Sequence, residues 1–268
     1  MTFRGASADA LAALSGELET ALAGSDAGQV GHDLFSVAAV LRSEPALRRV
    51  ATDVSLAAAA KQGLIRDIFD GKVTTAVLGL LTEAVGRRWT ATRDLADVLE
   101  HLGVVSTVRS AGPDSARLAD ELFGFGQILH DSPELRDALS DPARSAQDKG
   151  ALLQGLLDGK ALPATLALVH QALAGTHRTV NTALASYQQV AAEVHQQKVA
   201  TVRVARPLSD AERDRLAEAL SRKYSREIHL NVVIDPAVIG GIRVEIGDDV
   251  IDGTVSNRLD DARRKLAG

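Results

Sequence analysis

Hydrophobic residues in the first two thirds of the chain recur with the period of an α-helix. One apolar stripe consists of Leu34, Val37, Val40 and Leu41, and a second consists of Leu122, Phe125, Ile128 and Leu129. Spacings of three and four residues give a helix one apolar face, which packs against a core. Alanine and leucine, which favour helix, dominate these segments. The pattern therefore predicts an all-helical body that ends near residue 198.

The helical pattern repeats with an offset of 88 residues. Between residues 33–84 and 121–172, about a third of the aligned positions are identical, where roughly a tenth is expected by chance for this composition. Pro45 and Pro133 each follow an apolar run, and proline is tolerated in the first turn of a helix. We therefore predict two tandem helical bundles, each opening a short helix at its proline.

Other repeated features set the expected boundaries of the two bundles. Asp-Gly pairs ending at Gly71 and Gly159 are expected to close helices, because glycine readily takes a positive φ. The helix near 92–109 matches both the first helix of one copy and the closing helix of the next. We therefore predict bundles over 1–110 and 111–198 that share this helix, with a break at residues 111–114.

The hydrophobic period changes from about 3.6 to 2 in the last seventy residues. Alternating segments predict half-buried strands with one wet face at 200–204, 228–234 and 242–246, and a further short strand is expected after them. Ser209 and Glu212 form a capping-box pattern that predicts a helix after the first strand. A charged helix is expected at 256–266. The predicted fold class is therefore α+β, with a small α/β domain over 199–268 appended to the two helical bundles.

Composition excludes several classes of function. The net charge is -5 and aromatic residues make up 3% of the chain, so neither a basic surface nor stacking platforms for nucleic acid are supplied. Cysteine is absent, which removes thiolate chemistry and cysteine zinc sites. No stretch approaches a membrane span, and no secretory signal is evident. We expect a protein that is either cytosolic or peripheral to a membrane by way of partners.

The stretch from Ile234 to Thr254 is the main candidate for chemistry, since it contains a glycine pair and several aspartates. A phosphate loop would need its glycines between a strand and a helix N-terminus, whereas these glycines precede a strand. The aspartates lack the spacing of a calcium loop. We therefore favour a hairpin with its turns over a phosphate cradle or a metal loop, and expect no catalytic, cofactor-binding or metal-binding residues.

Three other features have a functional and a structural interpretation. His170 and His177 could share a helix face, but no third metal ligand is spaced to join them. Trp89, after two arginines, is either packed at a helix junction or an anchor for a partner; the packed interpretation is favoured. The charged residues between 260 and 265 are more typical of a solvated helix face than of a binding site.

The C-terminal region resembles the delta subunit of F-type ATP synthases, the family of the oligomycin-sensitivity-conferring protein. The resemblance covers about residues 93–268, and the first bundle is included mainly through the internal repeat. The matching positions, expected to have structural roles, are Asp235, Pro236, Ile239, Gly240, Gly241, Asp252, Gly253 and Leu259.

This resemblance implies a non-catalytic subunit of the peripheral stalk, or stator. Such subunits link N-terminal segments of the alpha subunits to the b subunits, and so resist the torque of the rotor during ATP synthesis. The implied location is the cytoplasmic face of the cell membrane, as a peripheral protein. No nucleic acid or cofactor is expected.

Two helical units, where one is usual, depart from the family pattern. We expect the second unit, which directly precedes the α/β domain, to hold the alpha subunits, while the first adds reach or a further contact. The alternative from composition and repeat alone is a helical-repeat adaptor unrelated to ATP synthase. That alternative does not account for the α/β tail.

Overall fold

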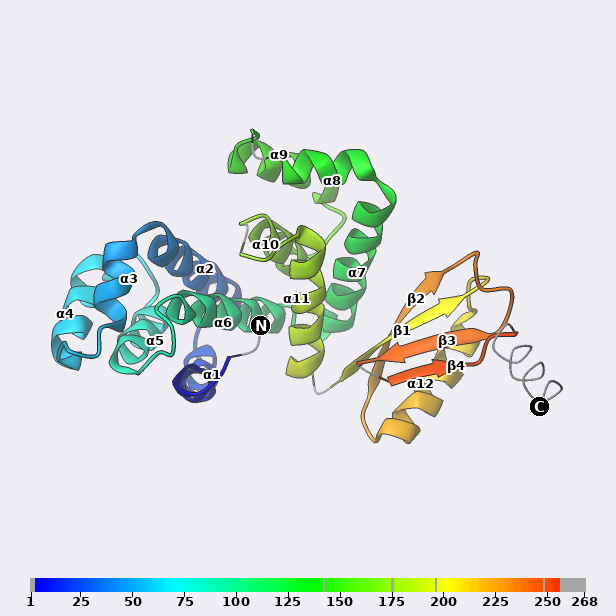
Figure 1. The fold of residues 1–268 in the computed structure, drawn as a ribbon, viewed down its shortest axis with the longest axis horizontal. Coiled ribbons are helices and arrows are strands. Elements are labelled where there is room, and N and C mark those ends of the chain that lie inside the picture. Colours follow the sequence, from blue (N-terminus) through cyan, green and yellow to red (C-terminus); the bar gives the residue numbers. More distant parts are fainter. Residues whose placement is uncertain (1–2, 142, 175, 196, 248, 256–268) are drawn as a thin grey trace, which may run out of the picture.

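The computed structural model of the chain describes residues 3–255, apart from 142, 175, 196 and 248. Within these residues the fold is α+β, with twelve α-helices and a small four-stranded sheet near the C-terminal end. All the helices but the last form a body at one end of the molecule, and the last helix lies with the sheet at the other end (Figure 1). The predicted fold class is confirmed at this level. The predicted helix at 256–266 lies outside the described residues.

Six helices form the first part of the body: α1 (Ala6–Leu22), α2 (Ala27–Ser43), α3 (Pro45–Thr52), α4 (Ala58–Phe69), α5 (Thr75–Gly86) and α6 (Asp94–Ser110). Local signals mark the ends of these helices. Asp26 caps α2 by accepting hydrogen bonds from the backbone N–H groups of Gly28 and Gln29. Pro45 opens α3, and Gly71 follows α4 with φ of 69°.

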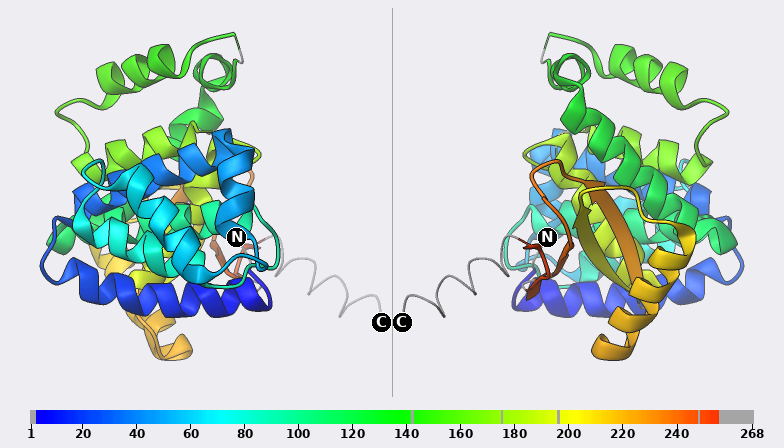
Figure 2. Two further views of the ribbon diagram at one scale, coloured as in Figure 1. Left: turned by 90° about the vertical axis from the view of Figure 1, so that its left-hand side faces the viewer. Right: turned by 90° about the vertical axis from the view of Figure 1, so that its right-hand side faces the viewer.

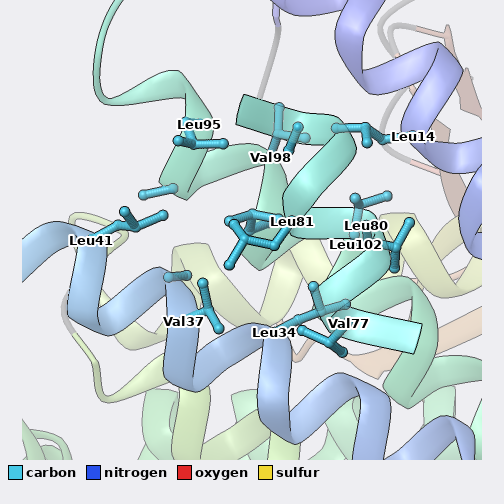
Figure 3. Close-up of a cluster of buried hydrophobic side chains, with 14 of the residues drawn as sticks. Leu14, Leu34, Val37, Leu41, Val77, Leu80, Leu81, Leu95, Val98 and Leu102 are labelled. Carbon is cyan, nitrogen blue, oxygen red and sulfur yellow. The ribbon is translucent and has the colours of Figure 1, made fainter. Parts of the chain in front are cut away.

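These helices enclose a first hydrophobic core, which Figure 3 shows in close-up. Leu34 of α2, Leu81 of α5 and Leu95 of α6 are all fully buried in it. Removing such a side chain typically costs about 2–5 kcal/mol, because the cavity left behind closes only in part. Leu34, Val37 and Leu41 of the predicted apolar stripe are buried in this core, but the prediction was wrong for Val40, which is exposed, and for Ile128 of the second stripe, which is 51% exposed.

A break at residues 112–114, a short 3₁₀ turn (η1, Gly112–Asp114), leads into the second part. Five helices follow it: α7 (Ser115–Asp131), α8 (Pro133–Ser140), α9 (Ala146–Leu157), α10 (Pro163–Ala172) and α11 (Val180–Val194). They surround a second core that includes Leu122, Leu168 and Tyr187. The predicted break is confirmed.

Helix α6 contributes to both helical cores. Its first half supplies Leu95, Leu99 and Leu102 to the first core, and its second half supplies Val104 and Val108 to the second. α2 lies alongside α6, and two glycines permit the close approach of their backbones. A Cβ on Gly103 would lie 2.7 Å from the ring of Phe35. The helix that the sequence predicts near 92–109 is therefore present, and it contributes side chains to both helical cores.

The sheet has the strand order β2-β1-β3-β4, built from β1 (Lys198–Val204), β2 (Ile228–Ile234), β3 (Ile242–Ile246) and β4 (Asp249–Asp252). β1 and β2 are parallel and are joined through α12 (Asp210–Tyr224), whereas β3 is antiparallel to β1 and to β4. α12 covers one face of the sheet with Leu216 and Leu220. The capping box of Ser209 and Glu212 is present at its start, as predicted.

The prediction that the second face of the sheet is wet was partly wrong. Asn231 on that face is only 4% exposed, and its side-chain N–H donates to Gln188 of α11 at 3.3 Å. α7 also contacts β2, as the views in Figures 1 and 2 show. Alternation along a strand tells which side chains share a face, but not whether a distant helix covers that face.

Candidate functional site

The stretch from Ile234 to Thr254 forms a turn, the antiparallel pair β3–β4 and a second turn. Residue pairs such as Val244 with Ile251 face each other across the two strands. Gly247, at the tip of the hairpin, has φ of 58°, a conformation that suits glycine. The hairpin interpretation is confirmed for the described residues of this stretch.

Asp235 and Pro236 form the turn that follows β2. The carboxylate of Asp235 accepts a hydrogen bond from the backbone N–H of Ala237 at 2.9 Å, and its own N–H donates to the carbonyl of Val204 at 2.8 Å. This is the short-range bonding by which aspartate stabilises a turn. Ile239, further along the same loop, is 76% exposed. Its apolar side chain therefore has no role in the core of the sheet domain.

Gly240 and Gly241 lie against the turn at Asp252 and Gly253. Gly241 has φ of 83°, and a Cβ there would lie 3.0 Å from the Cα of Thr254 and closer still to the carbonyl oxygen of Gly253. The N–H of Gly253 donates to the carbonyl of Ile242 at 2.9 Å, and that of Val255 to Gly240 at 3.0 Å. At Gly241, a side chain would therefore collide with the backbone of residues 253 and 254.

The Asp252 carboxylate belongs to the same turn. It accepts hydrogen bonds from the backbone N–H of Thr254 at 3.0 Å and from the Thr254 hydroxyl at 2.7 Å. These bonds hold the pKa of Asp252 below its usual value. The structure thus brings Gly240, Gly241, Asp252 and Gly253 together at one end of the hairpin, with Asp235 and Pro236 in the loop before it. Leu259 lies outside the described residues.

A cleft of about 1000 Å³ lies between the second face of the sheet and helices α7 and α11. Many of its polar groups are side-chain amides, from Gln127, Asn181, Gln188, Gln189 and Asn231. Amides form hydrogen bonds but do not activate a nucleophile. The cleft is also lined by ionisable residues: His130, Asp131, Arg203, Asp235 and Glu245. The cleft could not be predicted from the sequence, because no pattern within one strand or helix indicates how far that element lies from another.

The histidines do not form a metal site among the described residues. In that part of the chain there is no group of three or more His, Cys, Asp or Glu that could hold a metal ion. The suggestion that His170 and His177 share a helix face was wrong, since α10 ends at Ala172 and His177 lies beyond it. Burial lowers the pKa of His177, which favours its neutral form.

Trp89 is packed at a helix junction, as the favoured interpretation predicts. Its indole N–H donates to the carbonyl of Ala84, near the end of α5, at 3.0 Å, and its ring packs partly buried against the first core. Because the indole N–H already has an acceptor within the chain, Trp89 can stabilise the fold without contact with another protein.

The fold defines a class of protein: a helical body with an appended α/β domain. Its cleft is lined largely by polar side chains, and its glycine and aspartate motifs form turns of the backbone. The model of the family "ATP synthase delta (OSCP) subunit" matches residues 108–266. The chain is 55% identical to an ATP synthase subunit delta of a Nocardioides species, over 100% of this chain and 98% of the relative. The identity to the subunit delta of Kineococcus radiotolerans is 43%, over 94% and 92%. The chain belongs to the ATP synthase delta (OSCP) subunit family.

The solved structures add a weaker likeness. A chain of the Toxoplasma gondii mitochondrial ATP synthase hexamer matches with a TM-score of 0.34 and 18% sequence identity, over 57% of this chain and 97% of that chain. At that score the match carries no argument about the fold.

Family membership confirms the main functional predictions. The chain is a peripheral-stalk subunit of ATP synthase and is not catalytic by itself. The alternative of an unrelated helical-repeat adaptor has no support from these relatives. Within the described residues, no helix combines the length and hydrophobicity needed to cross a membrane.

Proposed function

We propose that the helical body of this subunit holds N-terminal segments of the alpha subunits and that the α/β domain holds the b subunits. The observation that carries the proposal is that the sheet domain has a hydrophobic core of its own, separate from the two helical cores, in a chain that belongs to the delta family. A protein that must connect two partners under load needs two separately folded ends. Short amphipathic helices are suited to accept a partner helix in a groove.

We further propose three domains, with the two helical units as a tandem repeat: 1–110, 111–198 sharing the helix near 92–109, and 199–268. The helix bounds support it. α2 to α4 begin at 27, 45 and 58, and α7 to α9 begin at 115, 133 and 146, a difference of 88 in each case. Gly71 and Gly159, also 88 apart, have φ of 69° and 67°. Equal spacing of both helix bounds and turns is what a duplicated unit produces.

The second helical unit is the one that we expect to grip the alpha subunits, because it directly precedes the α/β domain. The first unit then adds reach or a further contact with alpha or b. The location that fits this arrangement is the cytoplasmic face of the cell membrane, with attachment through the b subunits. We also propose that Asp235, Pro236, Ile239, Gly240, Gly241, Asp252, Gly253 and Leu259 are structural signature positions, not contact residues for a ligand.

Hydrogen exchange of the intact chain tests this assignment without disturbing the fold. A peptide of the alpha N-terminus should slow exchange in α7 to α11 and leave α1 to α5 unchanged, while the soluble part of b should slow exchange in residues 199–252. Protection of the first unit by the alpha peptide would reverse the order of the units. Protection of the sheet by the alpha peptide, or of α7 to α11 by b, would refute the division of roles.

Deletion of the first unit is a less suitable test. Helix α6 buries Leu95 and Leu99 against α1 to α5, so removing those helices would expose an apolar face and favour aggregation. A loss of binding in such a deletion would then have two explanations. The exchange experiment keeps every helix in place.

A further inference from the structure

Strand β2 is one of the two edge strands of the sheet, since the strand order is β2-β1-β3-β4. An edge strand pairs with a neighbour on one side only, so its other side carries backbone N–H and C=O groups that point away from the sheet. In the described part of the chain, the backbone groups of residues 229–234 form no hydrogen bond outside the pairing with β1. One side of β2 is therefore open to a further strand.

The two edges of the sheet differ in how they are protected. β4 has four residues and carries an aspartate at each end, Asp249 and Asp252. β2 has seven residues, Ile228–Ile234, and contains no lysine, arginine, acidic residue or proline. Short strands, charges and prolines are the usual means by which proteins prevent pairing at an edge. β2 is therefore the edge that is suited to pairing.

The cleft of about 1000 Å³ reaches this open edge. Four consecutive residues of β2, residues 231–234, line it. Successive side chains of a strand point to opposite faces, so a cleft that touches all four lies beside the edge as well as over the second face of the sheet. Exposure rises from 4% at Asn231 to 54% at Ile234. The cleft is therefore widest towards the end of β2.

Helix α7 forms the opposite wall of the cleft at this edge. Near the start of β2 the two elements meet, where His229 Nε2 lies 3.3 Å from Asp120 Oδ1. Past this contact they diverge (Figure 1), and Gln127 and Asp131 of α7 line the open part of the cleft. The space between α7 and the open edge is thus bounded on one side by a strand and on the other by a helix.

The walls of the cleft offer hydrogen bonds to a backbone. Gln127 of α7 and Gln188 and Gln189 of α11 line it, and a side-chain amide both donates and accepts. The outer edge of an added strand requires both kinds of group. The buried Oδ1 atom of Asn231 has no hydrogen-bond partner in the described part of the chain, although such atoms are normally paired. The cleft therefore has an acceptor for which this part of the chain supplies no donor.

The charges of the cleft favour a basic segment. Three carboxylates line it, from Asp131, Asp235 and Glu245, against the one guanidinium of Arg203. Arg203 lies 3.9 Å from both Asp235 and Glu245, and Arg243 pairs with Glu245 at 3.1 Å. Asp131 is the last residue of α7, where the helix dipole adds negative potential. A cation in the open part of the cleft is therefore stabilised.

We propose that the open edge of β2 accepts an extended segment of a partner protein, in which apolar and basic residues alternate, as a fifth strand of the sheet. Side chains on the α12 face of such a strand would lie beside Val232 and Ile234, and those on the second face would meet the carboxylates. The inference goes beyond the proposed function, because it assigns a mode of recognition and holds whichever partner supplies the segment.

A synthetic hexapeptide of alternating valine and lysine, blocked at both ends, tests the proposal on the full chain. We expect saturable binding, together with slower hydrogen exchange in residues 229–234, as measured by NMR. Exchange in β4 should not change, because that edge is short and charged. Absence of binding, or protection of β4 in place of β2, would overturn the proposal.

Methylation of the peptide backbone separates strand pairing from simple attraction of charge. One control peptide carries N-methyl groups on its valines and the other on its lysines, so that each lacks the N–H groups of one edge only. A strand pairs with β2 through one of its edges. One control should therefore bind about tenfold more weakly than the parent peptide, and the other about as well. Equal affinities of the two controls would overturn the proposal.

A lysine introduced on the open edge tests the site on the chain itself. Val233→Lys should weaken binding of the parent peptide about tenfold, because a charge on an edge strand opposes pairing. Ala219→Lys adds the same charge at an exposed position of α12, on the other side of the sheet, and should leave the affinity unchanged. Unchanged affinity in a folded Val233→Lys variant would contradict strand addition.

Removal of an exposed carboxylate tests the basic part of the pattern without disturbing the sheet. Asp131→Asn should weaken binding of the parent peptide about threefold, whereas Glu218→Gln on α12 should have no effect. Equal affinities in these two variants would overturn the assignment of a basic segment. None of these outcomes bears on which partner each end of the subunit holds, since that assignment is tested by hydrogen exchange with alpha and b.

Discussion

At the residue scale, the glycines of the C-terminal hairpin show how a motif that resembles a ligand loop can serve the backbone alone. Gly241 and Gly247 both have positive φ, but only Gly241 has backbone atoms where a Cβ would be placed. The two positions therefore separate conformational strain from steric exclusion. They form a matched pair for mutation.

Gly241→Ala is expected to destabilise the sheet domain by about 2–4 kcal/mol, because the new Cβ adds a clash with residues 253 and 254 to the strain of a positive φ. Gly247→Ala is expected to cost about 1–2 kcal/mol from strain alone, since no atom lies within 4 Å of its Cβ. Denaturant unfolding, monitored by hydrogen exchange in residues 199–252, measures the loss of stability in both variants. Equal losses in the two variants would show that the close contact is unimportant.

The capping box of α12 carries a pH-dependent contribution to stability. Hydrogen bonds from Arg206, and then from Ser209, lower the pKa of Glu212 from 4.5 to about 2. Since the folded pKa lies below the unfolded one, this contribution is fully present above pH 4.5 and is lost as the pH falls from 4.5 towards 2. Arg206→Gln should raise the pKa most and Ser209→Ala less, as seen by NMR titration. A pKa of about 2 in Arg206→Gln would contradict the assignment.

At the element scale, the crossing of α2 and α6 depends on the absence of side chains at Gly31 and Gly103. A Cβ on Gly31 would lie 3.1 Å from the carbonyl oxygen of Gly103 and would meet the hydroxyl of Thr107. Two helices approach this closely only where small residues face each other. The repeat and the apolar stripes predict both helices, but not that they would cross at glycines.

Gly31→Ala should therefore destabilise the chain by about 1–3 kcal/mol through overpacking. Gly16→Ala in α1, where no atom lies within 4 Å of the added Cβ, should stabilise it by about 0.5–1 kcal/mol because alanine favours helix. Thermal unfolding of the two variants gives opposite shifts of the midpoint. A stabilising Gly31→Ala would mean that the helices separate without cost.

The sequence predicts most elements because each has a local cause. Proline at position 133, the serine cap at 209 and the alternation in 242–246 act within a few residues, and the structure confirms the helices and strand that they indicate. The burial of Asn231 and the cleft beside it could not be predicted, since both depend on how α11 stands against the sheet. The burial of Glu100 could not be predicted for the same reason. Its partners Arg42, Thr176 and Tyr187 lie 58, 76 and 87 residues away in the sequence.

At the scale of the whole molecule, three hydrophobic cores lie in sequence and the first two share α6. A change in α6 should therefore affect both helical units, while a change in the sheet should remain local. The distinction follows from which side chains each core contains.

Leu102→Ala is expected to lower the free energy of unfolding by about 2–5 kcal/mol and to speed hydrogen exchange in both helical units. Val244→Ala, in the buried core of the sheet, should speed exchange in residues 199–252 alone. Hydrogen exchange read by mass spectrometry resolves the two regions. Faster exchange confined to the first unit in Leu102→Ala would show that the two helical cores unfold separately.

The sharing of α6 between two cores also has a consequence for how the helical body can lengthen. Because α6 packs in both helical cores, each additional helical unit would need five new helices instead of six. The two ends of the molecule keep their surfaces whatever the number of helical units between them. On the proposed repeat, a further 88-residue copy inserted at the break after α6 would lengthen the helical body by one fixed step, so the distance between its two ends could be set in whole units.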